Sequence, residues 1–281
     1  MKGFFIDTAD ISQIQGVLDK CTEHNISLNP YTFRGVTTNP NAMAKIDKYH
    51  FKDWIKHVDS INMFLSDYFG YMHSREIHVQ VPNSQTLNKS DIFYFIDAIL
   101  LECESDYVNL GIKISPMYLK LVSDIRDEYE GRVKVNVTGL ADAVNVFRAL
   151  SYGVDYASII PGRMEERSVN ANEHLELLAT RGVAGTSEVI TGSMRTLKGL
   201  YNAFKYNTVP TIGMRVWDQI FESDRTTSKF AKEIVSVSNI ISIRENASVE
   251  IPSTCIDLTR EFFEQMDELG KQCTHDVINR L

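Results

Sequence analysis

Short β-rich runs alternate with helical segments eight times between residues 3 and 221, and this alternation constrains the fold more than any other feature. The runs are rich in Val, Ile and Phe, and they end at polar or turn-forming residues, which is typical of buried strands. The expected strands cover residues 3–9, 34–40, 76–81, 108–115, 132–138, 155–161, 188–193 and 209–215. Strands that alternate with helices form parallel sheets, and eight such units predict a single α/β domain built as a closed (β/α)8 TIM barrel.

An open doubly wound sheet is the alternative architecture for this alternation. Such sheets usually have fewer strands and often a glycine-rich first turn, whereas the first turn here reads Asp7-Thr8-Ala9-Asp10. Asp10 precedes apolar residues at helical spacing and is expected to cap the first helix, and Asp142 is expected to cap the helix after the fifth strand.

The pattern changes after residue 221, where only helical segments follow, at 227–237 and 255–280. We therefore expect two regions, a barrel over residues 1–237 and a C-terminal helical extension over residues 238–281. The extension cannot be another barrel unit, so it is expected to pack on the barrel or on a neighbouring subunit. A homo-oligomer is accordingly expected.

Composition excludes several other classes of protein. With a net charge of −8 and no basic run, the chain is not expected to bind nucleic acid. Four scattered cysteines, with no Cys-x-x-Cys pair, predict neither a metal site nor a disulfide framework. The charged Asp7 comes too early for a signal peptide, and no apolar run approaches the roughly 18 residues of a membrane span. A cytoplasmic location without membrane contact is expected.

Lys113 lies inside the apolar run 108–115, and a lysine in a buried strand needs a physical reason. A buried ammonium group is costly unless it is paired with a carboxylate, so the site either lowers the lysine pKa or supplies a partner. A lysine that is neutral near pH 7 can attack a carbonyl carbon and form a Schiff base. A paired lysine, or one at a strand end that reaches solvent, is only structural.

Polar residues gather at the carboxyl ends of the expected strands, where barrels of this kind carry their chemistry. Each has an ordinary structural explanation: Asp7 as a helix cap, Thr37 and Asn39 as turn residues, Ser193 and Arg195 as a strand terminus and a solvated charge. Their convergence on one barrel mouth favours a carbonyl-activating site. The set comprises Asp7, Thr37, Asn39, Gln80, Lys113, Asn136, Thr138, Ser158, Arg163, Ser193 and Arg195.

The order of these motifs resembles the transaldolase family over roughly residues 1–237. The matching segments are Phe4-Phe5-Ile6-Asp7-Thr8-Ala9, Gly35-Val36-Thr37-Thr38-Asn39-Pro40, Lys113, Val135-Asn136-Val137-Thr138, Gly162-Arg163 and Gly192-Ser193-Met194-Arg195-Thr196. The first two are specific, and the others are weak alone but strong in this order.

The resemblance implies a class I aldolase that uses neither a metal nor a cofactor and that binds a sugar phosphate. Lys113 matches the Schiff-base lysine, and Asp7 matches the carboxylate that handles the proton of the donor hydroxyl. The other matches are Asn39 and Ser158 for the dihydroxyacetone portion with Thr37 beside them, Thr138 for a catalytic water, and Arg163, Ser193 and Arg195 for the phosphate. We further expect the arginines to keep Lys113 deprotonated by like-charge repulsion.

Gln80 departs from the resemblance, because transaldolases usually have a glutamate there and an amide cannot titrate. A glutamine looks like the fructose-6-phosphate aldolase branch, which uses a tyrosine on the sixth strand where this chain has Ile159-Ile160. Ser158 resembles transaldolase proper. His78 shares a strand face with Gln80, and it is either a substitute acid or base or an ordinary core histidine.

Three functions stay open at this point. The first is a Schiff-base enzyme that transfers or releases a dihydroxyacetone unit from a ketose phosphate. The second is a specialised aldolase of the same family with a different acceptor. The third is a non-catalytic sugar-phosphate binder, although binding alone needs no buried lysine.

Overall fold

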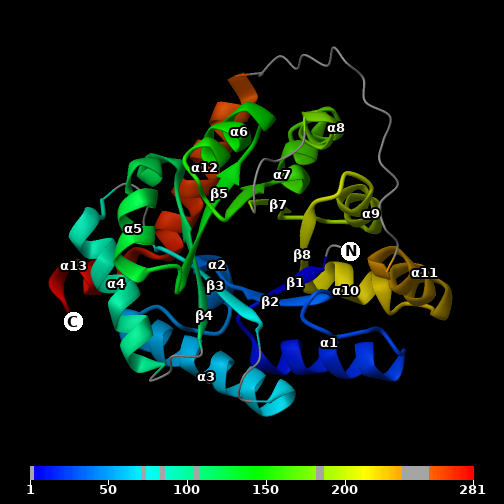
Figure 1. The fold of residues 1–281 in the computed structure, drawn as a ribbon, viewed down its shortest axis with the longest axis horizontal. Helices are drawn as coiled ribbons and strands as arrows, with labels where there is room; N and C mark the ends of the chain where they lie inside the picture. Colours follow the sequence, from blue (N-terminus) through cyan, green and yellow to red (C-terminus); the bar gives the residue numbers. More distant parts are fainter. Residues whose placement is uncertain (1–2, 71–73, 83–85, 104–107, 182–186, 236–252) are drawn as a thin grey trace.

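The computed structural model describes residues 3–70, 74–82, 86–103, 108–181, 187–235 and 253–281. Within them, parallel strands pair in chain order, and the last closes on the first to form a barrel (Figure 1). The strands are β1 (Phe4–Asp7), β2 (Phe33–Thr37), β3 (Glu76–Gln80), β4 (Asn109–Ile114), β5 (Val133–Leu140), β6 (Tyr156–Ile159), β7 (Glu188–Thr191) and β8 (Val209–Gly213). The predicted closed (β/α)8 barrel is confirmed.

Helices surround the barrel (Figure 1). They are α1 (Ile11–Glu23), α2 (Pro40–Ala44), α3 (Phe51–Phe69), α4 (Lys89–Glu102), α5 (Val122–Tyr129), α6 (Ala143–Ser151), α7 (Pro161–Glu166), α8 (Ala171–Arg181), α9 (Leu197–Lys205), α10 (Met214–Ile220), α11 (Asp224–Val235), α12 (Ser253–Leu269) and α13 (Lys271–Asn279). A 3₁₀ turn, Pro116–Leu121, occupies the first half of the helix expected after β4. The sequence pattern assigns no helix between residues 162 and 187, where the short α7 and α8 lie.

Side-chain caps fix where several helices begin. They therefore also limit where the strand before each of these helices can end. Asp10 accepts hydrogen bonds from the backbone N–H groups of Ser12 and Gln13, and Asp142 accepts one from Asn145. Both expected N-caps are confirmed. Because Asp10 caps α1, the carboxylate of Asp7 at the end of β1 is not needed for this purpose.

The apolar core lies mostly between the strands and the outer helices, whereas the barrel interior has its own small cluster. Phe5, Tyr156, Ile190 and Val209 form this inner cluster. His78 also lies inside the barrel, fully buried against the rings of Phe5 and Tyr156 at centroid distances of 4.6 and 5.0 Å. The interior is therefore a packed core with one imidazole embedded in it.

The C-terminal helices pack against both the mouth and the side of the barrel. α12 contacts α2, α7 and β5, while α13 contacts α3 and α4. The expected boundary between residues 237 and 238 lies outside the described residues, so the division into a barrel and an extension stays a prediction. Of the helices described, none combines the length and the apolar content that crossing a membrane requires.

Gly111 on β4 makes the room that His78 occupies, and this predicts a stability effect. A Cβ atom at Gly111 would lie 2.6 Å from His78 Nε2 and 2.7 Å from its Cγ. Gly111→Ala should therefore destabilise the protein by about 1–3 kcal/mol through overpacking, measured by urea unfolding.

Gly16→Ala is the matched control, because no atom lies within 4 Å of a Cβ at this exposed position of α1. It should stabilise the protein by about 0.5–1 kcal/mol. If both variants changed the free energy of unfolding equally, the close approach of Gly111 to His78 would be refuted.

Candidate active site

Lys113 lies near the carboxyl end of β4 with its side chain inside the barrel mouth. Only 7% of the residue is exposed, and its Nζ donates a hydrogen bond of 3.2 Å to the Thr38 carbonyl oxygen. Parallel pairing places Gln80 of β3 and Asn136 of β5 in register on either side of it. The buried lysine expected from the sequence is thus framed by two amides.

The environment of Lys113 favours its neutral form. Burial lowers the pKa of the Lys113 amine, and the negative charge of Asp7 opposes part of this lowering. The sequence-based expectation that arginines depress this pKa was wrong about the cause, because removal from water is the dominant effect. A lowered pKa shifts a lysine toward the neutral amine, which is the form that acts as a nucleophile.

Asp7 and Thr37 meet at the ends of the neighbouring strands β1 and β2. Thr37 Oγ1 donates a hydrogen bond of 2.9 Å to Asp7 Oδ1, and the two residues are paired in register. Asn39 instead caps α2, where its side chain accepts from the Ala42 N–H at 3.0 Å. Asn39 thus has a structural role as a helix N-cap, and its role in binding substrate stays a prediction. Asp7 is not the cap of α1, and its carboxylate lies within electrostatic reach of Lys113.

Two buried polar atoms beside Lys113 have no hydrogen-bond partner among the described residues. They are Oε1 of Gln80, a residue that is 2% exposed, and Oγ1 of Thr38. Leaving a buried acceptor or donor unsatisfied is costly, so each of these atoms calls for a partner, either an ordered water or a bound ligand. Gln80 therefore belongs to the mouth by geometry, although its amide cannot exchange a proton as a carboxylate does.

Thr138 and Ser158 lie on β5 and β6, and both are 4% exposed. Ser158 Oγ donates a hydrogen bond of 2.8 Å to Asn136 Oδ1. Asn136 thereby links Ser158 to the centre of the barrel, a role that the sequence analysis did not assign. Asn136 lies two residues before Thr138, so both side chains lie on one face of the strand. This spacing is the feature of the sequence that could have predicted the position of Asn136 in the site.

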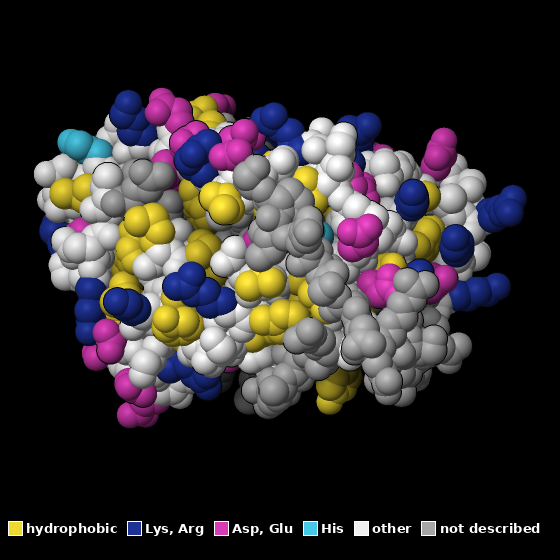
Figure 2. All heavy atoms as spheres, turned by 90° about the horizontal axis from the view of Figure 1, so that it is seen from above, with side chains coloured by type: hydrophobic (Ala, Val, Ile, Leu, Met, Phe, Trp, Pro, Cys, Tyr) yellow, Lys and Arg dark blue, Asp and Glu magenta, His cyan; other side chains and the backbone are white. Residues whose placement is uncertain are grey.

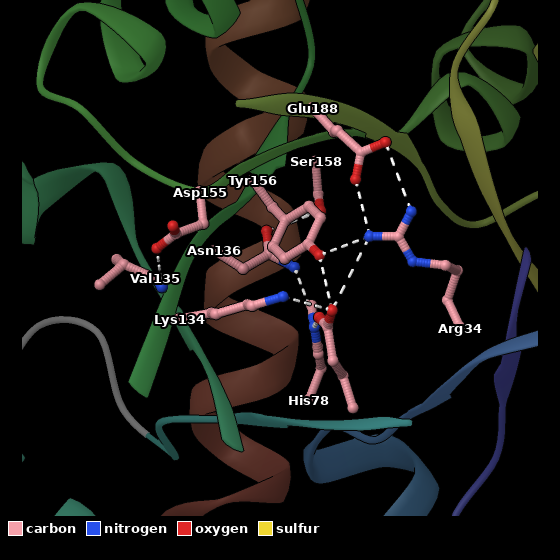
Figure 3. Close-up of polar contacts among 10 residues, drawn as sticks. Arg34, His78, Lys134, Val135, Asn136, Asp155, Tyr156, Ser158 and Glu188 are labelled. Carbon is pink, nitrogen blue, oxygen red and sulfur yellow. Dashed lines mark hydrogen bonds and ion pairs between the residues drawn. The ribbon is translucent and has the colours of Figure 1, made fainter. Parts of the chain in front are cut away.

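His78 does not reach the mouth in this structure. Its ring is fully buried, its Nδ1 lies 3.1 Å from Asn136 Nδ2, and its Nε2 lies 2.8 Å from Glu76 Oε2 (Figure 3). Both nitrogens thus have partners inside the barrel. The hypothesis that His78 is a substitute acid or base in contact with substrate is not supported, and the core alternative fits its position.

Glu76 anchors a charged cluster at the opposite end of the barrel interior. It contacts Lys134 Nζ at 2.6 Å and Tyr156 Oη at 2.9 Å, and Arg34 bridges it to Glu188. Burial raises the pKa of Glu76, but the hydrogen bond and charge of His78 and the charge of Lys134 outweigh burial and lower it to about 2. Tyr156 is thus committed to this cluster, and burial raises its pKa.

Arg163 in α7, which follows β6, and Arg195 in the loop that follows β7 lie near each other. Burial and the positive charge of Arg195 lower the pKa of Arg163, which is half-buried. A Cβ atom on Gly162 would collide with the carbonyl oxygen of Ser193, so the absence of a side chain lets α7 touch the loop after β7. Two neighbouring guanidinium groups have the charge and the donor geometry that suit a doubly charged anion such as a phosphate, and this role of the arginines stays a prediction.

Residues that the sequence analysis did not single out hold these arginines. Arg195 Nε donates to Glu166 Oε1 at 2.9 Å, and Arg163 Nη2 donates to Gln265 Oε1 of α12 at 2.6 Å. The Arg163 guanidinium also lies 5.1 Å from the centre of the Phe262 ring. No local signal reveals these contacts, because α12 is distant in the sequence.

On the face shown in Figure 2, basic and acidic side chains are interspersed. Within the described residues, no three His, Cys, Asp or Glu side chains are grouped in a way that could hold a metal ion.

Comparisons with known proteins connect this geometry to a family. A protein described as a probable transaldolase from Syntrophobacter fumaroxidans is 26% identical over 244 residues, which cover 82% of this chain and 95% of that protein. Probable transaldolases from Chlorobaculum parvum and Clostridium botulinum (strain Eklund 17B / Type B) are 23% and 26% identical, each over 82% of this chain and 96% of its own length. The chain is a distant relative of transaldolases.

Other comparisons add little to this relationship. No family model matches the chain. A crystal structure of the FimX EAL domain matches with a TM-score of 0.42 at 13% identity, over 56% of this chain and 66% of that one. The relationship to transaldolases thus stands on the similarity in sequence, and the fold stands on the barrel itself.

The opposing effects of burial and Asp7 on Lys113 predict its titration. The amine should lose its proton at a lower pH than surface lysines do, and Asp7→Asn should lower its pKa further because the opposing negative charge is removed. NMR of the isotope-labelled ε-methylene groups of lysine, followed over pH, measures both values. A Lys113 resonance that titrates with the surface lysines, or an upward shift in Asp7→Asn, would contradict this assignment.

Proposed function

We propose that the protein is a transaldolase-like enzyme that forms a Schiff base between Lys113 and the carbonyl carbon of a ketose phosphate. The observation that carries this proposal is the buried Lys113 amine with its lowered pKa, framed by Gln80, Asn136 and the Asp7–Thr37 pair. The distant relationship to probable transaldolases supports the same chemistry.

In the proposed reaction, the neutral amine of Lys113 adds to the ketose carbonyl, and the resulting carbinolamine loses water to form an iminium ion. The Asp7 carboxylate then takes the proton from the hydroxyl on the far side of the scissile carbon–carbon bond. As that bond breaks, its electron pair moves into the iminium, leaving an enamine on Lys113 and releasing an aldehyde. The enamine attacks an acceptor aldehyde, which is transfer, or takes a proton, which is release; water then frees Lys113.

The remaining residues of the mouth would bind the substrate around this reaction. Thr138 is proposed to position the water that leaves and returns, and Asn39 and Ser158 to hold the dihydroxyacetone portion, with Thr37 beside them. Arg163, Ser193 and Arg195 would bind the phosphate. The arginines now contact Gln265 and Glu166, so a bound phosphate has to replace or share these partners.

Gln80 gives a specific reason to keep a second candidate, a specialised aldolase of the same family. Its side chain is buried next to Lys113, and no described residue is a hydrogen-bond partner of its Oε1. The amide supplies no titratable group for moving protons through water. Such an enzyme would use the same lysine but a different acceptor, or would release the dihydroxyacetone unit instead of transferring it.

A homo-oligomeric state and a cytoplasmic location stay predictions from the sequence. The four cysteines are all free and buried, and nothing in their arrangement supports a disulfide framework.

Trapping the intermediate tests the proposed function. Incubation with fructose 6-phosphate and borohydride should add a reduced three-carbon or six-carbon adduct to Lys113, located by mass spectrometry of peptides. Lys113→Met should form no adduct and lose at least about 10³-fold in the rate of carbon–carbon cleavage while staying folded. The absence of any adduct on Lys113 of the unmodified protein would overturn the proposal.

Binding of the phosphate by the arginine pair makes a separate prediction. Arg163→Gln should raise KM for fructose 6-phosphate about 10- to 100-fold, because a hydrogen bond to a charged group is lost. The KM of the same variant for unphosphorylated fructose should change little. Arg167→Gln is the control. It removes an exposed ion pair between the end of α7 and Glu261 of α12, and it should leave KM for both sugars unchanged. Equal losses with the two sugars would exclude a phosphate role for Arg163.

A further inference from the structure

A chain of buried hydrogen bonds runs from the charged cluster inside the barrel to the mouth. It joins Glu76, His78, Asn136 and Ser158, at 2.8, 3.1 and 2.8 Å in that order. Figure 3 shows how the side chains from β3, β5 and β6 point toward one another along this path. Each of the four residues is at most 4% exposed, so solvent does not complete these bonds.

The chemistry at the Glu76 end fixes the direction of the first bond. Glu76 is ionised and accepts from Lys134 and Tyr156, so its Oε2 also accepts, and His78 Nε2 carries the proton. Burial is the main effect that lowers the pKa of His78, opposed by the hydrogen bond and charge of Glu76, and this lowering favours the neutral ring. A neutral ring protonated on Nε2 has only a lone pair on Nδ1.

That lone pair determines the orientation of the next two groups. Nδ1 requires a donor, so the Asn136 amide turns its Nδ2 toward His78 and its Oδ1 toward Ser158. Oδ1 can only accept a hydrogen bond, so the Ser158 hydroxyl donates its proton to the hydrogen bond with Asn136. The lone pairs of Ser158 Oγ are what remain for a molecule in the mouth.

We propose that Glu76 and His78 are positioning residues that make Ser158 a hydrogen-bond acceptor for a hydroxyl group of the substrate. This inference rests on the proposed function, because it deepens the recognition of the donor at the same mouth. A doubly protonated His78 would reverse the chain: Nδ1–H would face Oδ1, the amide would donate to Ser158, and Ser158 would donate into the mouth.

The barrel is adapted to hold this imidazole, which an ordinary core residue would not require. Gly111 on the neighbouring strand leaves the volume that the ring fills, and Phe5 and Tyr156 pack against it. An apolar side chain would fill the same volume without the cost of burying two ring nitrogens. The ring instead connects a fixed carboxylate to a substrate-facing hydroxyl.

The first test measures the direction of the chain without any substrate. NMR of nitrogen-labelled histidine in the full-length protein should show His78 neutral and protonated on Nε2 throughout the neutral pH range. A His78 ring that is protonated on Nδ1, or on both nitrogens, would overturn the proposal.

The second test measures recognition of the hydroxyl, with two small donors as probes. Dihydroxyacetone and hydroxyacetone, which lacks one hydroxyl, are each trapped on Lys113 with borohydride over a range of concentrations. His78→Phe keeps a ring of similar shape without nitrogens, and it should reduce the preference for dihydroxyacetone about tenfold, as expected for one misdirected hydrogen bond. His78→Gln, whose amide can donate to Glu76 and accept from Asn136, should restore most of the preference.

The outcomes separate this inference from the proposed function. If His78→Phe lowers trapping of both donors equally, or if His78→Gln does not differ from His78→Phe, the positioning role is refuted. If the unmodified protein traps neither donor, the proposed function fails, while the NMR measurement still decides the direction of the chain. If His78→Phe does not fold, two measurements still test the proposal. They are the tautomer of His78 in the unmodified protein and the preference of His78→Gln for dihydroxyacetone over hydroxyacetone.

Discussion

Removal of the Lys113 amine from water is the constraint on which the arrangement of the mouth depends. A charged ammonium group at this depth would need a close ionic partner, and instead Nζ meets the backbone carbonyl of Thr38. The free-energy cost of the charged form therefore shifts the amine toward neutrality, while Asp7, held by Thr37, limits that shift. Closing eight parallel strands into a barrel is what brings β1, β2 and β4 close enough for these effects to act together.

The charged and polar groups of the barrel interior lie at two separate ends. At one end, Glu76 is compensated by Lys134, Arg34 and the histidine, and that end is closed by polar contacts. At the other end, Gln80 and Thr38 keep unpartnered polar atoms beside the lysine. Glu76 thus has its partners within the scaffold, whereas Gln80 and Thr38 each have a buried polar atom without a hydrogen-bond partner among the described residues.

The barrel and the location of the lysine could be predicted from the sequence because both follow from local patterns. Strand runs, helix periodicity and caps such as Asp10 act over a few residues, so each is visible in the chain itself. The cause of the Lys113 pKa shift, the chain through Asn136 and the contact of Gln265 with Arg163 were not predictable in this way. They depend on side chains that are far apart in sequence and on burial that only the closed barrel defines. The helix α8 was not predicted, because its apolar pattern is short and because it comes after a turn that the sequence pattern did not predict.

The origin of the carbonyl oxygen in the product tests the account most directly. A Schiff base at Lys113 expels the carbonyl oxygen of the donor as water and regains an oxygen from solvent before the product leaves. In water labelled with heavy oxygen, the product ketose or dihydroxyacetone should therefore carry the label at its carbonyl carbon from the first turnover, after correction for spontaneous exchange. Carbon–carbon cleavage that retains the original oxygen would contradict a covalent role for Lys113.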